Sequence, residues 1–232
     1  MSNRYLIGSG FFARRESQKW FYHIWEDNTF NTTSPAKVLV LSAAGQKLDS
    51  SRVQWTVLNG DLGHVVSGVK AAWSGWSISM CTLALMAYAE ECDFIFKEQD
   101  ALCFGPWVNQ MYAELGTASM ICGRNRSMVV ANSVFLVRHD WIPMFVSTYL
   151  GMGDERDPKD LGEQKMFKMI CKFPKICKFY NFGYDRDRPF NPKDAVFNVQ
   201  QLTSGELILL RDHGLISFEG DPPEGGFTSF PK

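Results

Sequence analysis

The 232-residue chain lacks the short motifs that identify several common enzyme classes. No G-x-G-x-x-G follows the first clearly predicted strand, where "SAAGQ" holds too few glycines for a dinucleotide-binding turn. A G-x-x-x-x-G-K-[ST] sequence is absent, which excludes a P-loop enzyme. A G-x-S-x-G sequence is absent too, which argues against the usual hydrolase elbow.

Paired cysteines are also missing. None of the six cysteines forms a C-x-x-C pair, and no histidine lies at zinc-ligand spacing beside them. Most of them lie in apolar runs, where a free cysteine behaves as a small hydrophobic residue. We therefore expect reduced thiols, a cytoplasmic protein and no structural zinc.

The chain has neither an excess of one charge nor a long apolar run. Its 24 basic and 25 acidic residues give a net charge of -1, so no overall field attracts nucleic acid or a membrane surface. The first residues lack the apolar core of a signal peptide, and no uncharged run is long enough to span a bilayer. Because 45% of the residues are hydrophobic, a substantial core is expected. The sequence predicts a soluble protein with no nucleic-acid partner.

The order of the predicted elements favours an α/β fold. Strands that alternate with helices in the first half indicate βαβ units and a mainly parallel sheet. The strands between 93 and 138 follow one another closely, which indicates some antiparallel pairing. We expect a single domain over 1–232, with 1–35 as an aromatic extension packed on it. The predicted strands are 38–41, 53–58, 93–96, 101–104, 118–123 and one within 127–140, and the predicted helices are 77–91, 106–115, 141–151, 163–173 and one beginning near 204.

Three polar residues, Glu98, Gln99 and Asp100, directly follow the apolar strand "DFIF". In open α/β sheets, ligands bind at the carboxyl ends of the strands. Carboxylates at positions i and i+2 point to the same side and can reach one ligand. A hard divalent cation takes carboxylate oxygens and bridges them to substrate phosphates. The alternative is a solvated turn, since acids are ordinary loop residues.

The elements around these acids resemble those of GT-A-fold glycosyltransferases, which use nucleotide-diphosphate sugars. The resemblance covers roughly residues 36 to 217 and is specific at "DFIFKEQD", where Glu98 replaces the first Asp of an Asp-x-Asp motif. It implies a GT-A-like, Rossmann-like α/β fold with Mn²⁺ or Mg²⁺ as the metal. By the resemblance, Asp100 would ligate this metal, and Glu98 would assist it or contact the ribose.

The resemblance also gives a role to the stretch "LGEQKMF". Glu163 stands at the start of a predicted helix, after a Gly-rich acidic loop, where inverting members carry their general base. A carboxylate there would accept the proton of the acceptor hydroxyl. The alternative is that Glu163 only stabilises the helix N-terminus, where negative charge is favourable. Asp160 is the reserve candidate.

The nucleotide would contact residues around the first two predicted strands. Ser42 ends strand 38–41, and Asn59, His64 and Lys70 lie in the Gly-rich stretch before the apolar helix. By the resemblance, this stretch touches the nucleotide and the sugar. A structural His64 and a solvent-facing Lys70 are the alternatives.

The resemblance therefore implies a metal-dependent, inverting transferase that moves a sugar from a nucleotide-diphosphate donor to a hydroxyl of a glycan or small acceptor. Arg186 and Arg188 suit a phosphate or an acidic sugar, or else form a salt-bridged turn with neighbouring acids. A nucleotidyltransferase that makes the activated sugar is one alternative, although no early phosphate loop supports it. A non-catalytic carbohydrate-binding module is the other, in which the aromatic residues would matter and the acids would not.

Overall fold

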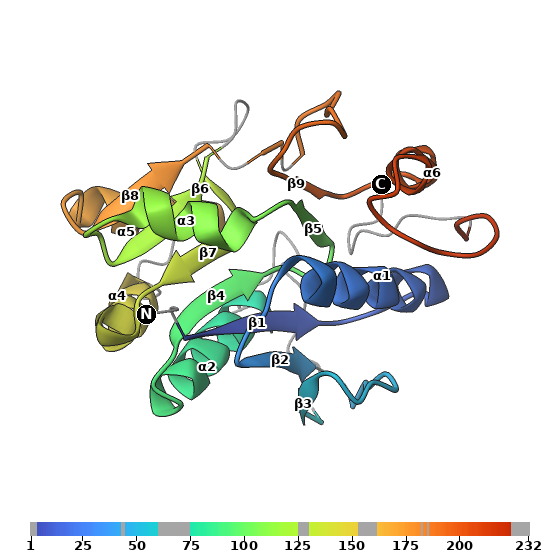
Figure 1. The fold of residues 1–232 in the computed structure, drawn as a ribbon. Helices are drawn as coiled ribbons and strands as arrows, with labels where there is room; N and C mark the ends of the chain where they lie inside the picture. Colours follow the sequence, from blue (N-terminus) through green and yellow to red (C-terminus); the bar gives the residue numbers. More distant parts are fainter. Residues whose placement is uncertain are drawn as a thin grey trace.

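The computed structural model describes residues 4–42, 45–59, 75–124, 130–152, 162–181, 183–184 and 186–223. A seven-stranded sheet forms its centre, in the order β3-β2-β1-β4-β7-β6-β8 (Figure 1). The four strands from β3 to β4 are parallel, β7 is antiparallel to both of its neighbours, and β8 is parallel to β6. The strands are β1 (Tyr5–Phe11), β2 (Lys37–Ser42), β3 (Gln54–Val57), β4 (Asp93–Lys97), β6 (Met120–Gly123), β7 (Ala131–Val137) and β8 (Cys177–Tyr180).

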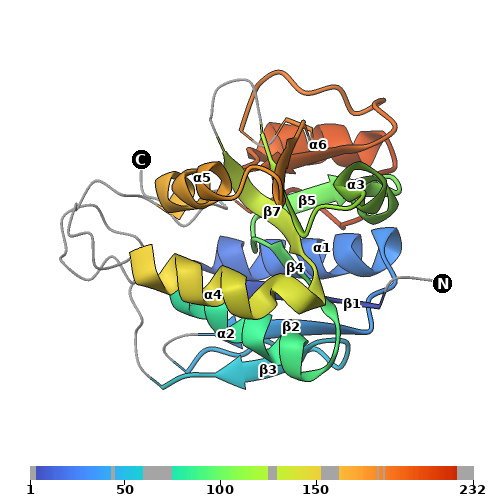
Figure 2. The same ribbon diagram turned by 90° about the vertical axis from the view of Figure 1, so that its left-hand side faces the viewer.

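Both faces of this sheet are covered (Figures 1 and 2). One face carries α2 (Gly75–Ala89), α4 (Ile142–Gly151), which follows the short 3₁₀ turn His139–Trp141, and α5 (Gly162–Lys172). The other carries α1 (Glu16–Thr32), α3 (Trp107–Leu115), α6 (Ser204–Asp212) and a two-stranded sheet of β5 (Ala101–Phe104) and β9 (Phe197–Gln200). The mixed, mainly parallel sheet between helices and the antiparallel pairing after residue 93 confirm the sequence prediction.

The first strand corrects the expectation that residues 1–35 are an added extension, because Tyr5–Phe11 form β1 and Glu16–Thr32 form α1. β1 lies in the middle of the sheet, between β2 and β4. Glycines let α2 approach it closely. A Cβ at Gly8 would lie 2.7 Å from the Phe94 ring and 3.1 Å from the Leu83 Cβ, and one at Gly10 would lie 3.0 Å from a serine hydroxyl of α2. These glycines also interrupt the apolar pattern by which a strand is predicted.

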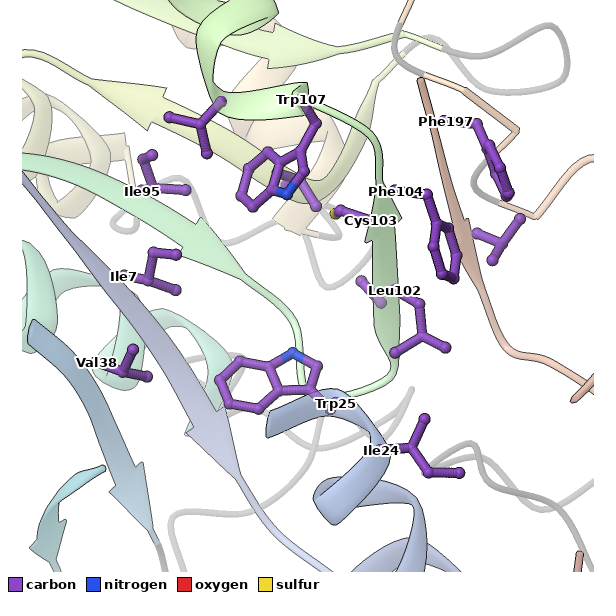
Figure 3. Close-up of a cluster of buried hydrophobic side chains, with 14 of the residues drawn as sticks. Ile7, Ile24, Trp25, Val38, Ile95, Leu102, Cys103, Phe104, Trp107 and Phe197 are labelled. Carbon is purple, nitrogen blue, oxygen red and sulfur yellow. The ribbon is translucent and has the colours of Figure 1, made fainter. Parts of the chain in front are cut away.

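A tryptophan-rich core joins the small sheet to the large one (Figure 3). Trp25 of α1 and Trp107 of α3 are fully buried, together with Ile7 and Ile95 of the large sheet and Phe197 of β9. Large aromatic side chains contribute strongly to such a core because each buries much apolar area. This packing fixes β5 and β9 beside the end of β4, where the three polar residues lie.

The six cysteines, all of which the structure describes, form no disulfide, and the described helices are short. All six cysteines are free, and every one except Cys171 is buried. Within the described ranges, every helix is too short or too polar to cross a bilayer.

Candidate functional site

The parallel strands bring their carboxyl ends to one edge of the sheet. After β1 the chain continues to β2 and β3 on one side, and it then returns to β4 on the other side of β1. In open α/β sheets, a crevice for ligands forms at such a reversal of strand order. A ligand site is therefore expected among three segments that follow parallel strands: residues 12–15 after β1, the residues from 45 after β2, and residues 98–100 after β4.

Three glutamine side chains hold the backbone of residues 12–15. Gln99 accepts from the Phe12 N–H (2.9 Å) and donates to the Phe12 carbonyl (3.0 Å). Gln46 makes the same two-point contact with Ala13, at 2.8 Å in both directions. Gln18 accepts from the next two backbone N–H groups, at 2.7 and 3.1 Å. The middle residue of "EQD" thus ties the segment after β4 to the segment after β1.

Replacing Gln99 by leucine is expected to destabilise the fold by about 1–3 kcal/mol, because it leaves a partly buried N–H and C=O of Phe12 unpaired. Urea denaturation measures this loss. Gln54→Leu, at an exposed position of β3, is the matched control. Equal stability of the two variants would contradict the bridging role of Gln99.

The two carboxylates of the motif converge on one atom. Asp100 is only 7% exposed, and its Oδ1 accepts from the Gln200 Nε2 at 2.8 Å. The same Nε2 donates to an oxygen of Glu98, whose own N–H donates to the Ser133 carbonyl at 2.8 Å. The structure therefore brings together the acid pair that the sequence singled out. Their roles as metal ligands stay a prediction.

This pair fits a hard cation better than a zinc ion. Across the part of the chain that the structure describes, no group of three or more His, Cys, Asp or Glu side chains could hold a metal. A closed zinc site needs four such ligands. One oxygen of each carboxylate accepts from the Gln200 amide, and each carboxylate has a second oxygen, the kind of ligand that a hard cation such as Mg²⁺ or Mn²⁺ takes. Water and substrate phosphate would complete the coordination of this cation.

A cavity of about 290 Å³ lies between the segments that follow β1 and β2. Its lining includes the cationic side chains of Arg14, Arg15, Lys19 and Lys47. Lys19 is paired with Glu16 at 2.6 Å, so the lining keeps a net positive charge. Such a cavity favours an anionic ligand. The sequence prediction missed it, although "ARR" after an apolar stretch was a visible signal.

The residues predicted to contact the nucleotide are only partly described. Ser42 is buried at the end of β2, and its hydroxyl donates to the Gln46 carbonyl. Asn59 is exposed just after β3. His64 and Lys70 lie outside the described residues, as do Gly60 and Gly63 before them. Ser42 ends β2 and Asn59 follows the neighbouring parallel strand β3, and their contacts with a nucleotide stay a prediction.

The predicted general base is only partly described. Glu163 is the second residue of α5, which begins one residue before the predicted start, but its side chain lies outside the described part of the structure. Asp160, the reserve candidate, also lies outside it. The role of Glu163 therefore remains a prediction from the resemblance.

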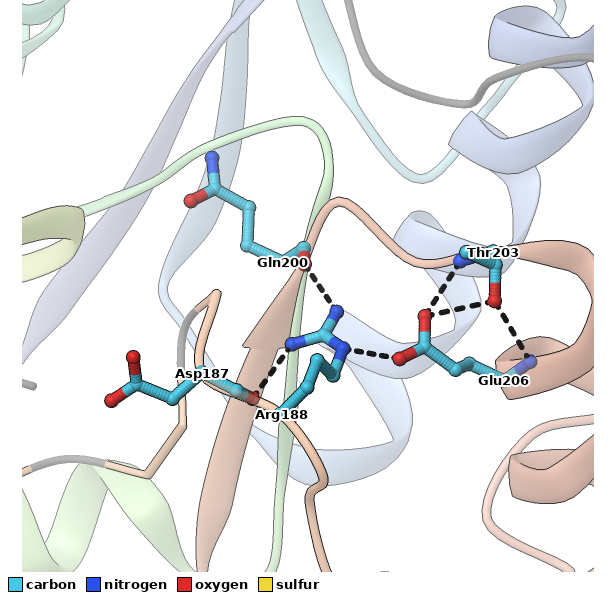
Figure 4. A network of polar contacts seen from close by, with 5 residues as sticks. All are labelled: Asp187, Arg188, Gln200, Thr203 and Glu206. Atoms are coloured by element: carbon cyan, nitrogen blue, oxygen red, sulfur yellow. Dashed lines mark hydrogen bonds and ion pairs between the residues drawn. The ribbon is translucent and has the colours of Figure 1, made fainter. Parts of the chain in front are cut away.

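Arg188 contributes to the scaffold of the site (Figure 4). Its guanidinium forms an ion pair with Glu206 of α6 and donates to the backbone carbonyls of Asp187 (3.0 Å) and Gln200 (2.8 Å). Glu206 in turn accepts from the Thr203 N–H at 2.8 Å at the start of α6. A salt-bridged arrangement was one of the two predicted alternatives. Among the described residues Arg188 pairs with Glu206 of α6, while Asp185, one of the predicted partners, lies outside them.

Gln200 itself was missed because strand β9 was not predicted. The only signal in the sequence was the alternation of apolar and polar residues in "FNVQ". β9 pairs with β5, about a hundred residues earlier, with Ala101 opposite Gln200. No local pattern reveals such a partner.

No protein-family model and no curated protein matches the chain. Solved structures match its fold. A glycosyltransferase involved in the glycosylation of the major capsid of PBCV-1 has a TM-score of 0.53 at 10% identity, over 91% of this chain and 99% of that one. An active-site variant of the galactosyltransferase LgtC has a TM-score of 0.52 at 12% identity, over 94% and 98%. The chain thus has the fold of these glycosyltransferases, which confirms the predicted GT-A-like architecture.

Proposed function

We propose that the protein is a glycosyltransferase that moves a sugar from a nucleotide-diphosphate donor to a hydroxyl of a glycan or small acceptor, with the help of Mn²⁺ or Mg²⁺. A fold alone does not determine an activity. The observation that carries the proposal is the convergence of Glu98 and Asp100 at the end of β4, beside the point where the strand order reverses. Carboxylates placed there suit a cation that carries a diphosphate.

The charges along this edge support a placement for the donor. The cationic cavity next to Arg14 and Lys47 lies above β1 and β2, and the acid pair lies above β4. The segment 12–15 connects the two places, since Gln46 and Gln99 both bind it. In this placement the anionic diphosphate lies between the cationic side chains of the cavity and a cation at Asp100. The bound cation would supply charge neutralisation to the departing diphosphate.

Glu163 is the proposed base. Glu163→Gln keeps the size of the side chain but removes its capacity to accept a proton. We expect turnover to fall by about 100- to 10,000-fold while donor binding remains, because general base catalysis contributes in this range. Stopped assays of product, together with donor titrations, separate the two effects. Unchanged turnover would show that Glu163 is not the base and only stabilises the N-terminus of α5.

The proposed function is tested by nucleoside-diphosphate release from a panel of UDP-, GDP- and TDP-sugars. The assays contain Mn²⁺ with or without excess chelator, and simple sugars serve as acceptors. The proposal predicts release from one donor, stimulated by an acceptor and abolished by the chelator. Pyrophosphate release from a nucleoside triphosphate with a sugar phosphate would instead indicate the nucleotidyltransferase. No release from any donor by a folded protein would contradict the proposal.

A further inference from the structure

The side chain of Gln200 donates hydrogen bonds to both acids of the motif, Glu98 and Asp100. It ends β9 and is 2% exposed. A primary amide nitrogen carries two hydrogens, so it can donate one to each carboxylate. Glu98 and Asp100 thereby share this donor. The shared donor reduces the repulsion between two like charges, of which Asp100 is buried.

The backbone of Gln200 is held from two sides. Its strand pairs with β5, where Ala101, the residue after Asp100, lies opposite. Its carbonyl accepts from Arg188 at 2.8 Å, and Arg188 is itself paired with Glu206. Figure 4 shows the side chain of Gln200 pointing away from this arginine. The amide thus extends from a fixed strand end towards the acids, which lie a hundred residues earlier in the chain.

We propose that Gln200 is a positioning residue of the cation site, which keeps the carboxylates of Glu98 and Asp100 converged so that one divalent cation can bind both. This inference rests on the proposed function and adds to it a residue from the C-terminal part of the fold. Groups that orient metal ligands by hydrogen bonds typically contribute about 10- to 100-fold to metal affinity. The Arg188–Glu206 pair affects the acids indirectly, because it holds the end of β9 from which the amide of Gln200 extends (Figure 4).

The experiment measures Mn²⁺ alone, by the electron paramagnetic resonance signal of the free ion, with the full chain. Gln200→Leu removes the amide at similar volume, and we expect it to weaken Mn²⁺ binding by about 10- to 100-fold. Gln54→Leu, the same change at an exposed strand position, should leave the affinity unchanged. Asp100→Asn should abolish binding and so identifies the site.

Gln200→Glu keeps the inference testable if Gln200→Leu does not fold. It places a third carboxylate against the other two, so the melting temperature should fall in chelator and recover with Mn²⁺ by more than that of the wild type. A purely structural glutamine would give the same loss with and without Mn²⁺.

The outcomes separate the inference from the proposed function. Wild-type affinity in Gln200→Leu, with binding lost in Asp100→Asn, would overturn the role of Gln200 and leave the cation site standing. Equal binding by the wild type and Asp100→Asn, or no binding by either, would overturn the cation site and the inference together.

Discussion

Asp100→Asn is expected to lower kcat/KM for the donor by at least about 100-fold. A cation that neutralises a departing diphosphate stabilises the transition state by several kcal/mol, and each 1.4 kcal/mol corresponds to about a factor of ten. Asparagine has nearly the shape of aspartate, and its Oδ1 can still accept from Gln200, which donates to Asp100 at 2.8 Å. The fold should therefore survive while the negative charge is lost.

Asp140→Asn is the matched control for this prediction. Asp140 is exposed and follows β7, which runs opposite to β4, so it lies at the other edge of the sheet. Kinetics at several Mn²⁺ concentrations should show a loss for Asp100→Asn that excess metal relieves only in part, and none for Asp140→Asn. If the activity of Asp100→Asn stayed within twofold of the wild type, the acid pair would not bind a catalytic cation and would be only part of a turn.

Lys97→Met is expected to stabilise the protein by about 1–3 kcal/mol at pH 7, since replacing a buried charged group by an apolar one of similar volume is often favourable. Lys97 is fully buried directly before Glu98. Its ammonium group lies 2.8 Å from Asn28 Oδ1, 2.7 Å from Thr29 Oγ1 and 5.1 Å from the Trp25 ring, none of which is charged.

Methionine also leaves no new polar group without a partner. The Asn28 Oδ1 still accepts from the Cys103 N–H at 3.0 Å, and the Thr29 hydroxyl still donates to the Trp25 carbonyl at 2.7 Å. Removing the charge of Lys97 therefore leaves no unpaired polar group that would offset the gain in stability. Chemical denaturation at several pH values measures the gain.

The stabilisation should depend on pH in a defined window. Burial lowers the pKa of Lys97 from 10.5 to about 8 in the folded protein, although a neighbouring cysteine acts in the opposite direction. Between these values the unfolded chain binds more protons, so the wild type gains stability as the pH rises, by about 3 kcal/mol in total from this residue. Below pH 8 both states carry the proton and the cost is constant. The advantage of Lys97→Met should thus shrink between pH 8 and 10.5.

Lys193→Met provides the comparison for this pH series, because Lys193 is exposed. It should change the free energy of unfolding by less than about 0.5 kcal/mol at every pH. A Lys97→Met protein that is less stable than the wild type by the same amount from pH 7 to 10 would contradict the lowered pKa. It would also show that the polar contacts of Lys97 outweigh its burial.

The sequence predicts the site best where the chemistry is local. "DFIF" has the continuous apolar pattern of a strand buried on both faces, and it forms most of β4. Acids that follow such a strand at i and i+2 must come to the carboxyl edge of the sheet. Strand direction was therefore enough to place Glu98 and Asp100 at this edge. A turn closed by the Ala101 N–H on the Glu98 carbonyl (3.0 Å) and the shared donor Gln200 bring their side chains together.

The rest depends on contacts that are distant in the sequence. β1 was not predicted because Gly8 and Gly10 weaken its pattern, and those glycines are explained only by α2 packing against them. Gln46, Gln99 and Gln200 look like ordinary loop or surface residues until the backbone groups and acids that they bind are brought beside them. A single glutamine is uncharged and forms no periodic pattern, so its role cannot be recognised from the sequence.

A donor site at the end of β4 is tested most directly by a calorimetric titration of UDP, GDP and TDP into the protein, with and without Mn²⁺, for the wild type and Asp100→Asn. We expect that one nucleoside diphosphate binds, that binding needs Mn²⁺, and that it is lost in the variant. Binding of none of them to a folded protein, or metal-independent binding that Asp100→Asn leaves unchanged, would contradict a donor site at the end of β4.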